Sequence, residues 1–147
     1  CPPMRTRLFI AAILACLAFA PGLNTDLYAH GDVTPQPIDT AGLDPLKEGE
    51  WLAENPYVGN AKAIEIGTSG YNQNCARCHG LGAVSGGLAP DLRYLELGKS
   101  GDEWFLERIR HGAKKPDGST MMPAFEGLIN QEAMWAIRSY LISIHQE

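Results

Sequence analysis

The chain has 147 residues, of which 45% are hydrophobic and 20% charged, and its formal net charge at pH 7 is −5. This length allows one small domain behind a leader segment, and a small domain has a thin core to which a bound cofactor can contribute. The acidic balance argues against binding to nucleic acid or to anionic membrane surfaces, and it favours a partner with a positively charged docking face.

The first 29 residues have the pattern of an export signal. Two arginines, Arg5 and Arg7, precede an apolar run over residues 8–20 that is too short to cross a bilayer. We predict cleavage after Ala29 and interpret residues 1–3 as leftover sequence upstream of the true start. The mature protein is then periplasmic and without a membrane span, and its formal charge is −6, because the leader carries two basic residues and one acidic residue.

The cysteines divide between the leader and the mature chain. Cys16 could carry a lipid tether, but the chain stays apolar over residues 17–20, where a tethered protein normally turns polar, so we favour the cleaved signal. Removal of the leader takes Cys1 and Cys16 with it. The mature protein keeps only Cys75 and Cys78, which are too few for a framework of disulfides and must serve another purpose.

Residues 30–59 are predicted to form an extended arm ahead of the main domain, which spans residues 60–147. Four prolines in this stretch, together with several Gly and Asp residues, prevent long helices. We expect the aromatic side chains of Trp51 and Tyr57 to hold the arm against the main domain.

Three helices are predicted in the main domain, each from a capping residue followed by apolar residues at helical spacing. They run over residues 61–74 after Asn60, from Ser100 to His111 with Glu103 completing a capping box, and over residues 131–144 after Asn130. No stretch shows a strand signal, and residues 80–98 and 114–127 are rich in Gly and Pro. The fold class is therefore all-α, with long loops wrapped around something that the helices do not fill.

Gly67 lies on the apolar face of the first predicted helix, in register with Ile64, Tyr71 and Cys75. Glycine is a poor helix former because it loses more backbone freedom on folding than other residues do. Its position on this face predicts that another backbone packs close to it.

The segment Cys75-Ala76-Arg77-Cys78-His79 fits the pattern for covalent attachment of haem c. Two thiols at this spacing at the end of a helix can reach the two vinyl groups of one porphyrin, and the next residue places an imidazole beneath the iron. A structural zinc site needs four protein ligands, and the mature sequence has no second pair at a suitable spacing. A thioredoxin-like redox pair needs a preceding strand in a βαβ context. We therefore predict one covalent haem c, with His79 as an axial ligand.

The second axial ligand is predicted to be a methionine. A thioether opposite His raises the reduction potential and closes the iron to other ligands, as suits an electron carrier. Met121 and Met122 precede Pro123, which restricts the residue before it to extended backbone. We favour Met122, with Met121 as the alternative; the competing interpretation is that both fill the core. The carbonyl of Pro90 is predicted to accept a hydrogen bond from the other ring nitrogen of His79. The remaining histidines are interpreted as surface residues: His30, His111 and His145.

The main domain resembles the class I cytochromes c. The resemblance rests on the small and aromatic residues Gly67 and Tyr71 before the attachment motif, on Ala89-Pro90-Asp91-Leu92, on Met122-Pro123-Ala124-Phe125 and on Tyr140 in the closing helix, and it covers residues 60–147. It implies that the first and last helices cross at these small and aromatic residues and that Met122 is the axial ligand.

A closer resemblance joins residues 70–74, 80–93 and 118–127 to the periplasmic cytochromes c that oxidise quinoprotein ethanol dehydrogenases. This resemblance implies that the donor is a PQQ-dependent alcohol dehydrogenase and that the acceptor is a terminal oxidase or another cytochrome. It also implies that Arg93 and Trp104 contact the haem propionates.

The sequence thus predicts a monomeric electron carrier rather than an enzyme, with outer-sphere transfer through an exposed haem edge. One alternative is a small haem enzyme, such as a peroxidase or a nitrite-handling protein, which needs an open sixth position on the iron. Another is a permanent cytochrome subunit of a larger dehydrogenase, with the arm as its interaction segment.

Overall fold

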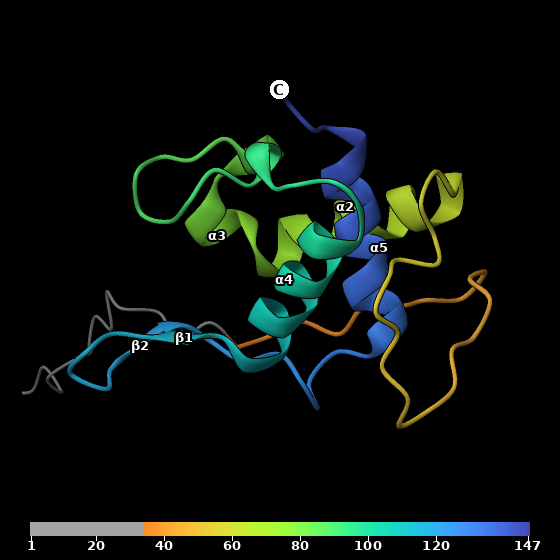
Figure 1. Ribbon diagram of the computed structural model, residues 1–147, viewed down its shortest axis with the longest axis horizontal. Helices are drawn as coiled ribbons and strands as arrows, with labels where there is room; N and C mark the ends of the chain where they lie inside the picture. Colours follow the sequence, from red (N-terminus) through yellow and green to blue (C-terminus); the bar gives the residue numbers. More distant parts are fainter. Residues whose placement is uncertain (1–33) are drawn as a thin grey trace, which may run out of the picture. The chain divides into compact units, whose positions relative to one another are not determined.

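Four α-helices and one short hairpin form the regular structure in a computed structural model that describes residues 34–147 (Figure 1). The helices are α2 (Ala61–Asn74), α3 (Ala76–His79), α4 (Gly98–His111) and α5 (Gln131–Ser143), and the strands are β1 (Ala113–Lys114) and β2 (Thr120–Met122). The predicted signal, its cleavage site and Cys16 lie outside the described residues. The all-α prediction is confirmed, and none of the helices in the described part is long and apolar enough to cross a membrane.

The caps predicted for the first and last helices are present. The side chain of Asn60 accepts a hydrogen bond from the backbone N–H of Ala63 at 3.1 Å, and that of Asn130 accepts one from Ala133 at 2.9 Å. Each bond satisfies a backbone donor that the first turn of a helix leaves without a partner. These two helices therefore begin where the sequence predicts.

The prediction for the start of α4 is wrong. The helix begins at Gly98, two residues before Ser100, and no capping box forms. The hydroxyl of Ser100 instead donates to the carboxylate of Glu96 at 2.8 Å, while Glu103 lies on the first turns of the helix beside Lys99. Gly98 has a φ of +78°, which a glycine adopts without strain, so the turn into the helix is made by backbone conformation.

A hairpin replaces part of the loop predicted over residues 114–127. β1 and β2 pair antiparallel, and the turn between them is closed by hydrogen bonds between Lys115 and Ser119 and between Gly118 and Lys115, both 2.9 Å long. Strands of two and three residues are too short to show an alternating pattern in the sequence. The hairpin extends away from the helices in Figure 1.

The core is built where α2 crosses α5. A Cβ atom placed on Gly67 would lie 1.9 Å from the carbonyl oxygen of Ala136, so only glycine permits this approach. The rings of Tyr71 and Tyr140 pack beside this contact with their centroids 5.2 Å apart. The prediction that another backbone packs against Gly67 is confirmed.

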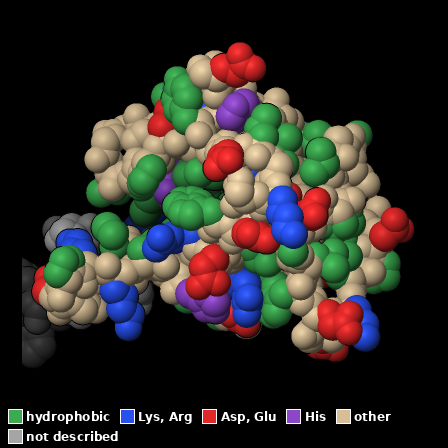
Figure 2. Space-filling view, in the orientation of Figure 1, with side chains coloured by type: hydrophobic (Ala, Val, Ile, Leu, Met, Phe, Trp, Pro, Cys, Tyr) green, Lys and Arg blue, Asp and Glu red, His purple; other side chains and the backbone are tan. Residues whose placement is uncertain are grey.

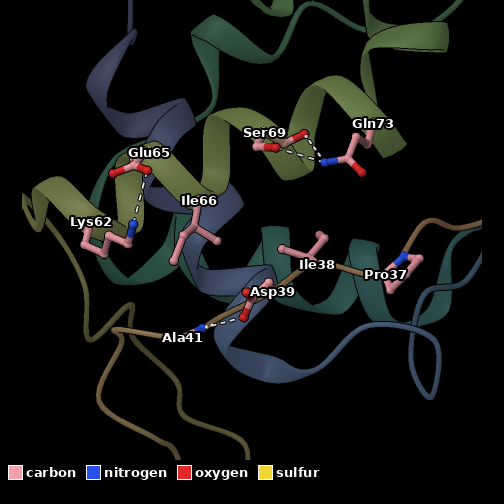
Figure 3. Close-up of a pocket in the computed structure, with 9 residues that line it drawn as sticks. All are labelled: Pro37, Ile38, Asp39, Ala41, Lys62, Glu65, Ile66, Ser69 and Gln73. Atoms are coloured by element: carbon pink, nitrogen blue, oxygen red, sulfur yellow. Dashed lines mark hydrogen bonds and ion pairs between the residues drawn. The ribbon is translucent and has the colours of Figure 1, made fainter.

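The segment before α2 has no helix or strand among residues 34–60, and it is held on the core by side chains. The amide of Asn74 exchanges two hydrogen bonds with the backbone of Gln36, at 2.6 and 3.2 Å. Figure 3 shows Ile38 directed at α2, beside a groove of about 380 Å³. A Cβ atom placed on Gly70 would lie 2.8 Å from the Cδ1 atom of Ile38, so the glycine leaves room for this side chain. The arm is thus packed on α2 at its beginning.

The later part of the arm is fixed to α4 and α5. The Tyr57 side chain is buried, and its hydroxyl donates to the carbonyl of Asp44. Its own carbonyl accepts from the Ser139 hydroxyl at 3.1 Å. Trp51 is only partly covered and lies under the guanidinium of Arg110, 4.0 Å from the ring centroid. Both aromatic residues therefore contact the helices, but Tyr57 is the one that enters the core.

Candidate haem site

The two cysteines lie at the end of α2 and on the single turn of α3. Cys75 ends α2, and its carbonyl accepts from the backbone N–H groups of Cys78 and His79 at 3.1 and 3.0 Å. This turn brings the two thiols and the imidazole to one short stretch of backbone. Both cysteines are half-buried and are not joined in a disulfide.

Burial raises the pKa of the Cys75 thiol to about 12, and the neighbouring Cys78 adds to the shift. A protonated thiol is a poor nucleophile and a poor metal ligand, whereas the redox-active cysteine of a thioredoxin-like pair needs a lowered pKa. In the described part of the chain, no group of three or more His, Cys, Asp or Glu side chains is placed to hold a bare metal ion. The donor that this motif offers to a metal is thus the imidazole of His79.

His79 is oriented by the loop that follows it. Its Nδ1 atom lies 2.8 Å from the carbonyl oxygen of Pro90, so Nε2 is the ring nitrogen available to a metal. The backbone just after His79 is also held, because the buried hydroxyl of Tyr71 donates to the carbonyl of Gly80 at 2.7 Å. Burial is the largest cause of the raised pKa of Tyr71, so this hydroxyl keeps its proton.

Arg93, expected at a haem propionate, is paired within the protein. Its Nε and Nη2 atoms donate to the two carboxylate oxygens of Asp91 at 3.0 and 2.8 Å. The Arg93 hydrogen bond is the largest cause of the lowered pKa of the Asp91 carboxyl. No role was predicted for Asp91 from the sequence; the signal that could have found it is the spacing of an Asp two residues before an Arg, where its side chain can also cap the following turn.

The two candidate methionines differ in their surroundings. Met122, the last residue of β2, is half-buried and packs against the core, whereas Met121 is 62% exposed. The carbonyl of Met122 is so close to Gly112 that a Cβ atom there would lie 2.3 Å from it. The backbone N–H of Phe125 donates to Ile109 at 2.9 Å, which ties the end of this loop to α4. The backbone after Met122 is therefore held by α4, and Met122 itself pairs with Ala113 of β1.

Large apolar side chains are exposed on the segments that carry the predicted site residues. They are Leu81, Val84, Leu88, Tyr94, Leu97, Trp104 and Met121. Tyr94 and Trp104 line one hollow, and the guanidinium of Arg108 lies 5.4 Å from the Trp104 ring centroid. Figure 2 shows hydrophobic side chains gathered between the α3 region and the hairpin. An apolar surface of this kind marks a binding site, and it suits a flat apolar macrocycle.

The donor set and the apolar surface together fit haem c. Two thiols at the right spacing, an imidazole with its second nitrogen already engaged and a thioether on a separate loop are the groups that hold this cofactor. A bare metal ion would instead require a compact polar site.

The chain is similar to known c-type cytochromes and cytochrome domains. The family described as "Cytochrome C oxidase, cbb3-type, subunit III" matches residues 62–141. The chain is 60% identical over 127 residues to cytochrome c550 of Pseudomonas aeruginosa, a match that covers 84% of this chain and 86% of the relative. None of the solved structures matches the chain significantly.

Two further relatives are larger than this chain. Over 92 residues, the chain is 35% identical to the quinohemoprotein alcohol dehydrogenase ADH IIB of Pseudomonas putida. This match covers 63% of this chain but only 13% of the dehydrogenase. Over 109 residues, the chain is 35% identical to the cbb3-type cytochrome c oxidase subunit FixP of Rhizobium meliloti, and that match covers 66% of this chain and 35% of the subunit. The matched regions are thus segments of longer proteins.

Proposed function

Because the chain belongs to the class I c-type cytochromes, we propose that it is a periplasmic carrier of single electrons with one covalently bound haem c. The family makes it an electron-transfer protein that uses haem c, and not an enzyme. The peroxidase-like alternative is therefore set aside. The observation that carries the proposal is the turn from Cys75 to His79 with the Pro90 carbonyl 2.8 Å from His79 Nδ1, in a chain 60% identical to cytochrome c550.

The proposed roles follow the chemistry of each side chain. Cys75 and Cys78 form the thioether links, His79 is the proximal ligand and Met122 is the distal ligand, with Met121 as the alternative. Trp104 lies on the exposed apolar surface, where a propionate contact is compatible with its half-exposed ring. Arg93 has Nη1 left for a propionate, since its other two side-chain nitrogens donate to Asp91.

When bound, haem c supplies an iron centre that accepts and releases one electron. The chain's own residues hold this centre and tune it. Pro90 orients His79 and makes it a stronger donor to the iron by accepting the Nδ1 proton in a hydrogen bond. The apolar residues on the loops exclude water from one side of the site, which favours the less charged state of a buried centre.

We further propose that the donor is a PQQ-dependent alcohol dehydrogenase and that the acceptor is a terminal oxidase or another cytochrome. The similarity to a quinohemoprotein alcohol dehydrogenase supports the first, and the similarity to a cbb3-type oxidase subunit supports the second. In those relatives a segment like this chain is part of a larger redox protein.

The function is tested with the haem-loaded mature protein. Oxidised protein is mixed with a quinoprotein alcohol dehydrogenase and ethanol, and reduction of the haem is followed by its visible spectrum, with a quinoprotein that acts on another substrate as the control. We expect fast reduction only when ethanol and its dehydrogenase are both present. Reduction that is equally slow with both dehydrogenases contradicts the proposed donor. Binding of carbon monoxide to the reduced native protein contradicts the closed His–Met site.

A second candidate is a permanent subunit of a dehydrogenase complex, because the similar segments in the alcohol dehydrogenases belong to one long chain. Under this proposal the protein copurifies with the dehydrogenase at fixed stoichiometry and stays bound at high salt. A free carrier separates as a monomer, because electrostatic docking weakens as salt rises.

A further inference from the structure

The loop between α3 and α4 presents the Pro90 carbonyl to His79. This loop follows the 3-10 turn Leu81–Ala83 and ends at a second one, Leu92–Tyr94. Pro90 lies eleven positions after His79, and its oxygen lies 2.8 Å from Nδ1. A loop of this length has no helix or strand to hold the carbonyl in place, so another group must do it.

Asp91 joins the two ends of this loop. One carboxylate oxygen accepts from the backbone N–H of Ser85 at 3.2 Å, at the beginning of the loop. The carboxylate also accepts from the Arg93 backbone at 3.0 Å and from the Arg93 guanidinium at 3.0 and 2.8 Å, beyond its end. Four donors thus meet one carboxylate that directly follows Pro90.

Ser85 adds a second tie inside the loop. Its hydroxyl donates to the carbonyl of Ala89, and it accepts from the backbone N–H of Gly87 at 3.0 Å. The peptide groups on both sides of Pro90 are therefore held, one through Ala89 and the other through Asp91.

The tie at Asp91 is anchored to the rest of the molecule. The carbonyl of Arg93 accepts from the backbone N–H of Gln146 at 2.9 Å, just after α5, and Leu92 packs against the core. The Asp91 carboxylate stays ionised through the ordinary pH range, because its pKa is held low chiefly by the Arg93 hydrogen bond. Hydrogen bonds to an ionised group are shorter and stronger than neutral ones.

We propose that Asp91, held by Ser85 and Arg93, is a positioning residue that keeps the Pro90 carbonyl against Nδ1 of His79 and thereby sets the strength of the axial imidazole. This proposal rests on the proposed role of His79 as a haem ligand. The main work of Arg93 is then to neutralise and orient Asp91, in addition to any propionate contact.

The proposal predicts the direction of two measurable changes when the tie is removed. A looser loop weakens the hydrogen bond at Nδ1, which makes the imidazole a poorer donor and favours reduced iron over oxidised iron. It also opens more often, so the Nδ1 proton of His79 exchanges faster with solvent.

The test uses the double variant Asp91→Ala/Arg93→Gln, which removes the tie and leaves the net charge unchanged. The matched control is Lys62→Gln/Glu65→Gln, which removes an exposed ion pair on α2, with 3.1 Å between its charged atoms, also without a change in net charge. The reduction potential is measured by spectroscopic titration, and the exchange of the His79 Nδ1 proton is measured by NMR of the reduced protein.

In Asp91→Ala/Arg93→Gln we expect exchange to be faster by about tenfold or more, given the strength of hydrogen bonds to charged groups. We expect the ratio of reduced to oxidised protein at the native midpoint to rise about threefold. The control variant should change neither quantity. Values like those of the native protein, or equal changes in the control, overturn the proposal.

If the double variant fails to load haem, Asp91→Asn decides the question, because it keeps the size of the side chain and removes the charge that strengthens its hydrogen bonds from Ser85 and Arg93. Faster Nδ1 exchange in Asp91→Asn supports the proposal, and native exchange overturns it. A failure of the proposed function has a separate signature: the unmutated protein would then show no haem c spectrum, or no coordinated His79 signal in NMR.

Discussion

Around the crossing of α2 and α5, the side chains of Tyr71, Met134 and Trp135 are each 0% exposed, whereas Leu81 and Leu88 on the loops after α3 are each 77% exposed. In the first region, protein atoms alone bury the core: α2 packs on α5 at Gly67, and the arm covers α2, α4 and α5. The second region carries the motif residues and leaves large apolar surface uncovered. The difference indicates that haem is the part of the core that the polypeptide does not supply.

The largest test of this comparison is to leave the haem out. The same chain, produced in a host that cannot attach haem, should lose about 4 kcal/mol or more of its free energy of unfolding, because the attached haem buries its apolar surface and gains its methionine ligand only in the folded state. Urea unfolding followed by circular dichroism measures the loss, with the haem-loaded chain as the reference. An unchanged unfolding midpoint would show that the exposed apolar side needs no cofactor.

The next test breaks the closed region. Gly67→Val places a side chain where the Ala136 carbonyl lies 1.9 Å from the Cβ position, so α2 and α5 must separate. We expect a loss of about 3 kcal/mol or more in the free energy of unfolding, at the upper end for overpacking.

The control for this variant is Gly86→Ala. Its Cβ atom would meet nothing within 4 Å, so we expect a change within about 0.5 kcal/mol. If the two glycine variants lose equal stability, the closeness of the α2–α5 crossing is not what holds the closed region together.

A third test uses pH on the arm. Burial is the main cause that raises the pKa of Tyr57 to about 12, with Glu132 and Asp44 adding to it, against 10.0 for the free side chain. The folded protein keeps this proton while the unfolded chain releases it. The stability that Tyr57 contributes is therefore complete below pH 10 and is lost as pH rises from 10 to 12, by about 2 kcal/mol.

Tyr57→Phe should remove this part of the alkaline loss, which urea unfolding at several pH values would show. At neutral pH the variant should cost about 1 kcal/mol, for the hydrogen bond from the hydroxyl to Asp44. The same alkaline slope in the variant and the native protein would assign the loss to other groups, with the buried Tyr71 as the first candidate.

The smallest effect is expected on the open side. Leu88→Ser should change the stability of the haem-free chain by less than about 0.5 kcal/mol, because the side chain is largely exposed there. Leu106→Ala on α4, which is buried, should cost about 2 kcal/mol or more. A cost above about 1 kcal/mol for Leu88→Ser in the haem-free chain would show that protein alone covers this loop, and would narrow the difference between the two regions.

Much of the fold follows from local patterns in the sequence. Asn60 and Asn130 cap their helices through bonds to the third residue beyond them, and such short-range contacts depend on few other parts of the chain. The start of α4 was missed because Ser100 found a partner in Glu96, outside the helix that it was expected to cap. Competition between two nearby partners is not visible in spacing alone.

The attachment motif and the candidate ligands His79 and Met122 are likewise predicted from residue types at fixed spacing. Their assignment as axial ligands stays a prediction. Spacing could not separate Met121 from Met122, since they are neighbours; the hairpin places one half-buried and the other exposed.

The sequence by itself therefore determined the starts of α2 and α5, the glycine at their crossing and the motif for haem c, because these depend on residues a few positions apart. The tertiary structure alone decided the pairing of Arg93 with Asp91, the tie from Asp91 to Ser85 and the hydrogen bond from Phe125 that holds the Met122 loop on α4. These contacts join separate segments, and which partners meet depends on how the loops close over the core.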